Sequence, residues 1–192
     1  MNFIYQKKKG LNSNSCKKII ELFEKSKYLQ KPGSTTLGED HSWKKSTDIG
    51  ISPQALNDPE WSSSVIEIVN TLNLTVEEYK NKFTLENSGV NTVSQWGLED
   101  NFNIQRYLPG EGYYIYHCEN TGVEHSCRML AWMIYLNTVS DGGGTKFLFQ
   151  NKITQAEEGK VLIWPSDWTH HHKGIVSPTE TKYIITGWYR YY

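Results

Sequence analysis

The sequence has few cysteines and no excess of charge of one sign. Its three cysteines, Cys16, Cys118 and Cys127, are an odd set without C-x-x-C spacing, so neither a disulfide framework nor a zinc site is indicated. With 20 basic and 21 acidic residues the net charge is −1, so no overall field attracts nucleic acid, and no basic run is interleaved with aromatic residues. We therefore expect a cytoplasmic protein without a nucleic-acid partner.

Long apolar runs are absent as well. No stretch approaches the ~20 residues that cross a bilayer, and the lysines near the start precede no apolar core of signal-peptide length. These absences predict a soluble protein without a membrane partner. A chain of 192 residues can bury about two-thirds of its unfolded surface as one unit. We expect a single domain over residues 1–192, with helical support at 11–96 and a β core at 101–192.

Apolar spacing near the N-terminus predicts helices. Ser13-Asn14-Ser15 is typical of a helix cap and precedes a 3.6-residue apolar period over residues 16–28. Asp58-Pro59 predicts the start of a second helix, and a third short one is expected at residues 76–83. The segment 31–52, rich in Gly, Ser, Thr and charge, is either a flexible connector or a partly ordered lid over a site.

After Gly97 the periodicity changes to that of strands. Aromatic residues make up 13% of the chain, including seven tryptophans, and they concentrate where strands are expected. Short strands between Gly, Pro and Asp turns predict a mainly β protein with α, a double-stranded β-helix (jelly roll) with the N-terminal helices packed on one face. The expected strands cover residues 103–108, 112–118, 128–136, 145–149, 160–164, 170–176 and 182–191.

Two histidines and one glutamate in the last half suggest a metal site. His117 and Glu119 are separated by one residue, so on a strand both side chains point to the same face. The run His170-His171-His172 offers a third ligand, with His170 and His172 on one face. Two imidazoles and a carboxylate with open positions suit the facial triad of non-haem iron oxygenases. Taken alone, an H-x-E pair is a weak signal.

Six motifs in order resemble the prolyl 4-hydroxylase-like branch of the iron(II)- and 2-oxoglutarate-dependent dioxygenases. That family has a Tyr-x-Pro-Gly segment before its H-x-D motif, then a Tyr-Leu-Asn strand, a Gly-Gly-x-Thr turn, and H-x-G ten residues before a basic residue. In this chain the motifs are Tyr107-Leu108-Pro109-Gly110, His117-Cys118-Glu119, Tyr135-Leu136-Asn137, Gly142-Gly143-Gly144-Thr145, His172-Lys173-Gly174 and Lys182. The ten-residue spacing to Lys182 selects His172 as the distal ligand and makes His170 a structural or supporting residue.

The resemblance implies Fe(II), 2-oxoglutarate and O2 as cofactors, with ascorbate as a further candidate. His117, Glu119 and His172 would bind the metal and carry the catalysis. The far carboxylate of 2-oxoglutarate needs a buried cation and hydroxyl donors to offset its desolvation. The resemblance assigns the binding of this far carboxylate to Lys182, Tyr135 and Thr186. It places Tyr107 and Tyr114 on the pocket wall near the metal.

One departure from the family pattern is Glu119, which replaces the usual aspartate and adds a methylene to the ligand arm. We expect Glu119 to remain a ligand. A lower metal affinity or an inactive relative is the alternative. Cys118 and Trp188 are interpreted as packing residues. Arg128 could reach an acidic partner, but a solvated or structural role is preferred. Asp167 and Thr169, beside the distal histidine, are expected to support it.

The expected reaction is hydroxylation of an unactivated C–H bond, with a peptidyl or free prolyl residue as the leading substrate. Because a fold does not fix function, hydroxylation of another amino acid or a small metabolite stays open. A non-catalytic jelly-roll binding module and a cupin-shaped zinc hydrolase are further alternatives. Neither explains a cation ten residues after the distal histidine, and the hydrolase also requires a base beside a metal-bound water.

Overall fold

The computed structural model describes residues 1–35, 38–83 and 95–192. Antiparallel β-sheet dominates this part of the chain, together with two α-helices, α1 (Ser13–Lys25) and α2 (Ser62–Phe83). None of the described helices has both the length and the apolar character needed to span a bilayer. The expected lid includes residues 36–37, and the expected helical support includes residues 84–94; these two stretches lie outside the described residues.

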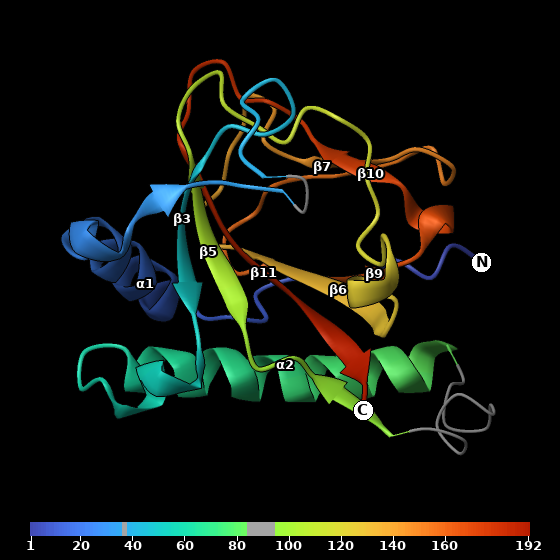
Figure 1. Ribbon diagram of the computed structural model, residues 1–192, viewed down its shortest axis with the longest axis horizontal. Helices are drawn as coiled ribbons and strands as arrows, with labels where there is room; N and C mark the ends of the chain where they lie inside the picture. Colours follow the sequence, from blue (N-terminus) through green and yellow to red (C-terminus); the bar gives the residue numbers. More distant parts are fainter. Residues whose placement is uncertain (36–37, 84–94) are drawn as a thin grey trace.

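The strands form a large sheet and a small one. Figure 1 shows α2 running below the large sheet, while β7 and β10 of the small sheet lie on the opposite side. The small sheet has the order β10 (His172–Gly174), β7 (Thr145–Phe147), β8 (Lys152–Thr154). The large sheet has the order β1 (Tyr5–Lys7), β9 (Val161–Pro165), β6 (Arg128–Tyr135), β11 (Lys182–Tyr191), β5 (Phe102–Tyr107), β3 (Thr47–Ile51), β2 (Lys31–Pro32), and β4 (Trp96–Leu98) also pairs with β11.

Strand β11 divides the interior into two layers because its side chains alternate between the faces of the sheet. Ile185 and Tyr189 belong to the core between the large sheet and the helices. Ile184, by contrast, belongs to a second core between the two sheets, and Trp188 packs against that core. The even-numbered residues of β11 therefore face the space enclosed by the sheets.

The two helices cover the outer face of the large sheet. Ile68 and Leu72 of α2 are buried in the outer core, and the Tyr189 hydroxyl donates a hydrogen bond to the Leu72 carbonyl at 2.9 Å. Burying a side chain of this size stabilises the fold by ~1.5–3 kcal/mol. Glu24 of α1 accepts hydrogen bonds from Arg106 at 2.8 and 3.0 Å, which attaches α1 to β5. Helix packing thus fixes the sheet that carries the inner face.

The helix bounds differ from those expected. Asn12, rather than Ser13, caps α1 by accepting the Ser15 N–H at 3.0 Å, and α1 ends at Lys25 before a 3₁₀ turn, Lys27–Leu29. The expected second and third helices are one continuous α2. Asp58 still accepts two backbone N–H groups, but in the turn that precedes the helix. Side-chain capping in a preceding turn looks the same in sequence as capping of the helix itself.

Several expected strands are shorter or absent. Residues 112–118 form no regular strand and have only single bridges, Lys44 to Tyr113 and His117 to His172. The expected strand at 170–176 is reduced to β10, preceded by the 3₁₀ turn Trp168–His170. The segment 31–52 contains β2 and β3, and β3 pairs with β5 inside the large sheet. Short strands that gain their stability from a neighbouring strand leave little periodicity in the sequence.

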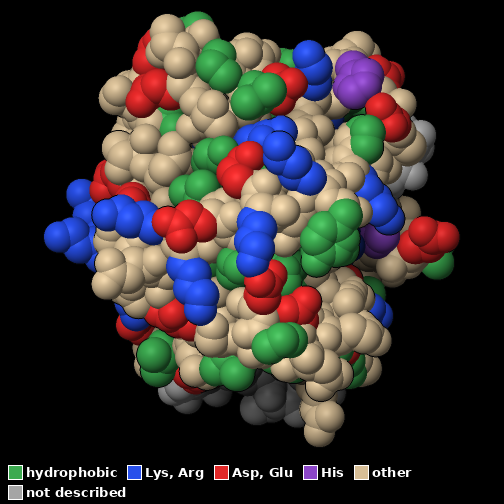
Figure 2. Space-filling view, turned by 90° about the vertical axis from the view of Figure 1, so that its left-hand side faces the viewer, with side chains coloured by type: hydrophobic (Ala, Val, Ile, Leu, Met, Phe, Trp, Pro, Cys, Tyr) green, Lys and Arg blue, Asp and Glu red, His purple; other side chains and the backbone are tan. Residues whose placement is uncertain are grey.

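The surface on the α1 side has mixed charge. Figure 2, which shows this face, has Lys and Arg side chains interspersed with Asp and Glu rather than gathered in one patch. The pair Lys25 and Glu60 and the pair Arg106 and Glu24 link neighbouring elements. This face therefore offers no broad surface of one sign.

Candidate metal and cofactor site

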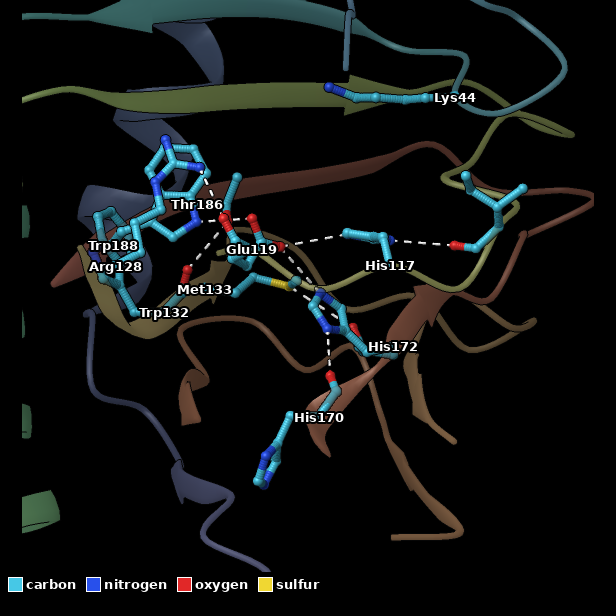
Figure 3. A network of polar contacts seen from close by, with 12 residues as sticks. Lys44, His117, Glu119, Arg128, Trp132, Met133, His170, His172, Thr186 and Trp188 are labelled. Atoms are coloured by element: carbon cyan, nitrogen blue, oxygen red, sulfur yellow. Dashed lines mark hydrogen bonds and ion pairs between the residues drawn. The ribbon is translucent and has the colours of Figure 1, made fainter. Parts of the chain in front are cut away.

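Three of the predicted residues converge between the two sheets. Oε1 of Glu119 lies 3.4 Å from Nε2 of His117 and 3.3 Å from Nε2 of His172. One ligand atom from each residue lies within 4.8 Å of the others, and within the described ranges this is the one group of three or more such residues. Figure 3 shows both imidazoles directed at the Glu119 carboxylate. The arrangement presents two nitrogens and one oxygen to a common point.

Backbone carbonyls set the direction of both imidazoles. Nδ1 of His117 contacts the Ile115 carbonyl at 3.2 Å, and Nδ1 of His172 contacts the His170 carbonyl at 3.0 Å. A carbonyl only accepts, so each Nδ1 carries the proton and each Nε2 keeps a free lone pair. This tautomer leaves Nε2 available to a metal ion.

Aromatic rings hold the imidazoles in place. Tyr113 stacks on His117 with ring centroids 3.6 Å apart and an interplanar angle of 10°. Trp164 and Phe147 pack on His172 at centroid distances of 4.9 and 5.6 Å. These contacts restrict ring rotation, so the site is preformed before any ion binds.

Cross-strand pairing, rather than a continuous strand, brings the ligands together. The backbones of His117 and His172 exchange two hydrogen bonds, at 3.0 and 2.9 Å. A tight turn precedes β7, the strand that pairs with β10 and so positions His172. Gly142 and Gly143 have φ values of +84° and +71°, and a Cβ on Gly142 would lie 2.4 Å from the Val176 carbonyl oxygen. Only glycine fits such a turn without strain.

The Glu119 carboxylate is charged in this site. Burial alone would raise the pKa of Glu119, but the close contacts with the imidazoles of His117 and His172 hold that pKa well below its usual range. Burial lowers the pKa of His117, and the neighbouring His172 lowers it further. An ionised carboxylate beside a neutral imidazole is the protonation state that metal binding requires.

A cavity of about 1250 Å³ extends from these residues, and Lys182 lines it from β11. Lys182 is only 5% exposed, and burial lowers its pKa to about 8. Its Nζ lies 4.7 Å from the centre of the Tyr107 ring, and it forms no hydrogen bond or ion pair with any described residue. A buried ammonium without an anionic partner is costly, which suits a site that receives an anion.

This geometry lies in a segment that resembles a known family. Residues 102–190, slightly less than half of the chain, match the family model of the 2OG-Fe(II) oxygenase superfamily. This segment of the chain is therefore similar to a 2OG-Fe(II) oxygenase domain. The matched segment contains both histidines, Glu119 and Lys182. None of the curated protein sequences compared with the chain is a significant match.

Solved structures of prolyl hydroxylases share the fold. A viral collagen prolyl hydroxylase of Paramecium bursaria Chlorella virus-1 has 17% identity and a TM-score of 0.68, covering 98% of this chain and 96% of that one. A Pseudomonas putida prolyl-4-hydroxylase has 16% identity and a TM-score of 0.72, covering 99% and 94%. A Trichoplax adhaerens prolyl hydroxylase, solved with a hypoxia inducible factor peptide, has 15% identity and a TM-score of 0.77, covering 99% and 84%. The predicted double-stranded β-helix is confirmed.

Two more residues predicted for the oxygenase site line the cavity. The Tyr107 ring lies against Lys182, and its hydroxyl donates to Oε1 of Gln105 at 2.8 Å. Thr186 lines the same cavity, and its hydroxyl donates to the Trp132 carbonyl at 3.1 Å. Both hydroxyls can still accept a hydrogen bond.

Tyr135 and Tyr114 lie outside the cavity lining. The buried Tyr135 hydroxyl is shared with Thr145 at 2.6 Å and Thr154 at 3.2 Å, and Thr145 is the cavity-lining member of this trio. The Tyr114 hydroxyl donates to the Gly110 carbonyl, and its neighbour Tyr113 contacts the metal-binding group instead. Because residues 112–118 do not alternate as a strand, the sequence could not tell which of the two tyrosines faces inward.

The expected support for the distal histidine comes from a different group. Asp167 accepts the backbone N–H and the hydroxyl of Thr169, and the Thr169 hydroxyl contacts Nδ1 of His170 at 2.8 Å. Asp167 and Thr169 therefore orient His170, and only the His170 carbonyl reaches His172. Nε2 of His170 contacts the Asn2 carbonyl at 2.9 Å, which gives His170 the structural role expected of it.

A buried ion pair on the cavity wall was missed in the sequence. Nζ of Lys44 contacts Oδ2 of Asp48 at 2.7 Å, and the same oxygen accepts a hydrogen bond from Gln105 at 3.1 Å. Figure 3 shows Lys44 across the site from His172. These residues come from the segment expected to be a connector or lid, and in the structure the segment lines the cavity. The charge-rich composition of residues 31–52 is typical of an exposed loop, so the burial of Lys44 and its pairing with Asp48 were not predicted.

Proposed function

We propose that the protein is an Fe(II)- and 2-oxoglutarate-dependent dioxygenase that hydroxylates a prolyl residue of a peptide, with ascorbate as an accessory reductant. The observation that carries this proposal is the convergence of His117, Glu119 and His172 in one cavity with the unpaired Lys182. In the proposal, β1 and β3 belong to the same catalytic unit because they complete the large sheet.

The donor set suits Fe(II). Two imidazole nitrogens and one carboxylate oxygen, without a cysteine among them, match the ligands of non-haem iron oxygenases. Fe(II) bound with 2-oxoglutarate and O2 would supply the oxidising power that converts a C–H bond to C–OH while 2-oxoglutarate becomes succinate and CO2. His117, Glu119 and His172 would hold the metal with open positions on the cavity side. The rings of Tyr113 and Trp164 keep two of these ligands from rotating.

The Lys182 end of the cavity suits the far carboxylate of 2-oxoglutarate. Lys182 supplies a desolvated positive charge, and Thr145, Thr186 and Tyr107 place hydroxyl groups on the same lining. In this proposal Tyr135 acts through Thr145, whose hydroxyl it holds at 2.6 Å. Gly174 leaves the Lys182 ammonium accessible. A Cβ at this position would already lie 3.5 Å from Nζ, so any side chain here would lie against the ammonium.

The size and lining of the cavity support a substrate larger than 2-oxoglutarate. Its volume of about 1250 Å³ exceeds the ~300–1,000 Å³ of a typical small-molecule pocket. Trp43, Tyr113, Tyr116 and Trp188 line it, and aromatic faces pack well against a proline ring. The structural neighbour solved with a hypoxia inducible factor peptide supports a peptide substrate.

A turnover experiment tests this function. We expect the purified protein, supplied with Fe(II), 2-oxoglutarate, O2 and ascorbate, to form succinate faster when proline-containing peptides are present. Mass spectrometry should find one added oxygen atom on proline, and none on matched peptides with alanine in its place. Succinate without peptide oxidation would retain the oxygenase and overturn the prolyl substrate. A protein that binds neither Fe(II) nor 2-oxoglutarate would leave a jelly-roll binding module.

The binding of 2-oxoglutarate should weaken with alkaline pH. Because burial lowers the pKa of Lys182 to about 8, the free protein loses the positive charge as the pH rises through that value. Affinity should be constant below pH 8 and fall about tenfold per pH unit above it, since binding then requires uptake of a proton. Calorimetric titration of the Mn(II)-loaded protein measures this dependence.

Lys182→Arg is the matched control for the pH dependence, because a guanidinium stays charged over the whole range. The variant should lose the alkaline decrease while keeping measurable affinity. An equal decrease in the variant and the wild type would assign the pH dependence to another group.

A further inference from the structure

The two oxygens of the Glu119 carboxylate have different surroundings. Oε1 faces the imidazoles, 3.4 Å from Nε2 of His117 and 3.3 Å from Nε2 of His172. Oε2 points the other way and accepts a hydrogen bond from Nε1 of Trp188 at 2.8 Å. Figure 3 shows Glu119 between the two histidines on one side and Trp188 with Arg128 on the other. The carboxylate is therefore held in one orientation.

Trp188 is itself fixed by Arg128. The guanidinium carbon of Arg128 lies 3.4 Å from the centre of the Trp188 ring, a close cation–π stack. The same guanidinium donates to the backbone carbonyl of Glu119 at 3.3 Å and to the Glu99 carboxylate at 3.4 Å. Arg128 thus contacts the ring of Trp188 and also the backbone of Glu119, whose carboxylate Trp188 holds. This closed set of contacts leaves the indole N–H little freedom to move.

The hydrogen bond at Trp188 is not a general requirement of buried tryptophans in this fold. The indole N–H groups of Trp61, Trp132 and Trp164 are buried and have no hydrogen-bond partner among the residues that the structure describes. The fold tolerates an unpaired indole N–H at three positions, whereas at Trp188 the N–H meets the carboxylate of a metal-binding residue. A ring that served only as packing would not need this contact.

The contact bears on the use of glutamate at this position. Compared with aspartate, Glu119 has one more rotatable bond, so an unrestrained side chain would lose more conformational freedom on ordering. A free carboxylate could also offer both oxygens to a cation and occupy two coordination positions, one of which the proposed reaction needs. An N–H that occupies Oε2 counters both effects, because it selects one rotamer and engages one oxygen.

We propose that Trp188 is a positioning residue whose indole N–H holds Oε2 of Glu119, so that Oε1 alone is presented to the metal. This inference rests on the proposed function, since it takes the three-residue group as the iron site. It assigns to Trp188 and Arg128 the task of adapting the longer glutamate arm to a site with three open positions.

Trp188→Phe tests the proposal, because phenylalanine keeps a benzene ring for Arg128 and lacks the N–H donor together with the five-membered ring that carries it. Mn(II) or Fe(II) affinity, measured anaerobically, should fall by roughly 10–100-fold, the range observed when a partner of a metal ligand is lost. Trp61→Phe is the matched control, since it removes a buried indole N–H that has no partner and is in the core on the helix side of the sheet. It should bind metal as the wild type does.

A vibrational signature separates positioning from general destabilisation. The infrared difference spectrum between Mn(II)-loaded and metal-free protein reports the gap between the two carboxylate stretching bands, which is wide when one oxygen binds and narrow when both do. We expect a wide gap in the wild type and a narrower one in Trp188→Phe. A narrow gap in the wild type overturns the proposal even if the variant fails to fold.

The inference and the proposed function fail in different ways. A wild-type protein that binds neither Mn(II) nor Fe(II) would contradict the iron site itself. A wild type that binds metal, with a Trp188→Phe variant of equal affinity and unchanged carboxylate bands, would overturn only the role assigned to Trp188.

Discussion

His172→Ala is expected to lower metal affinity by more than the roughly 10–100-fold that loss of a ligand's partner costs, and to abolish 2-oxoglutarate turnover. The reason is that His172 is one of the three protein donors that the described part of the chain brings to the site, and its Nε2 is already directed there by the His170 carbonyl. Two remaining donors would leave the ion weakly held and mostly hydrated. Anaerobic titration with Fe(II), followed by succinate measurement, checks both effects.

His171→Ala is the control for this variant. His171 is the adjacent residue on the chain, but its Nδ1 contacts the Trp168 carbonyl and its side chain is not part of the metal-binding group. Fe(II) affinity should stay within about twofold of the wild type, since the three donors are untouched. An equal loss of affinity in both variants would point to damage to the small sheet and contradict the ligand assignment.

Lys182→Met is expected to lower the affinity for 2-oxoglutarate at least about a hundredfold, because removing one partner of a buried ion pair costs ~3–5 kcal/mol. Methionine fills a similar volume, so the cavity should keep its shape. Metal affinity should change little, since Lys182 lies outside the three-residue group. Calorimetry with 2-oxoglutarate on the Mn(II)-loaded variant gives the result. Unchanged affinity would place the far carboxylate elsewhere in the cavity.

The same substitution should stabilise the ligand-free protein. The folded-state pKa of Lys182, about 8, lies below the ordinary value of 10.5, so at pH 7 the charged lysine disfavours the folded state. One pKa unit corresponds to ~1.4 kcal/mol, which makes this penalty of the order of 3 kcal/mol. The contact with the Tyr107 ring offsets only about 0.5–2 kcal/mol of it. Thermal unfolding at pH 7 should therefore shift upward in Lys182→Met.

The penalty has a definite pH dependence. It is fully present below the folded-state pKa and disappears as the pH rises past the unfolded-state value, so the stability gain of the variant should shrink between pH 8 and pH 10.5. A residue kept for stability would show the opposite sign. A gain in stability with a loss of ligand affinity is the pattern of a residue retained for binding.

The fold was predictable to the extent that its elements have a local signature. Apolar periodicity located α1 and α2 and the long strands β6 and β11, because each buries one regular face. It missed β2, β3, β4 and β8, which have two to five residues and depend on pairing with another strand. It also predicted a strand over residues 112–118, because their aromatic content is typical of one. The structure has two single bridges in this segment instead.

The site was predictable where it depends on residue type and short spacing. Histidines 117 and 172 with Glu119 form the expected group, and alternation along β11 puts Lys182, Thr186 and Trp188 on one cavity-facing side. The function of Trp188 was missed because its partner lies 69 positions away in the chain, at Glu119. In a sequence, a tryptophan that only packs cannot be distinguished from one whose indole N–H donates a hydrogen bond, unless the acceptor is known.

The sequence by itself determined the chemistry of this protein: an iron-type donor set, a lysine ten residues beyond the distal histidine, and the alternation that aims both at one interior. Tertiary structure decided which atoms meet. The bridge between His117 and His172, the inward placement of Tyr113 rather than Tyr114, and the hold of Trp188 on one oxygen of Glu119 all arise from contacts between distant segments. Spacing along a chain encodes which way neighbouring side chains point, whereas distances between separate segments depend on how the sheets pack.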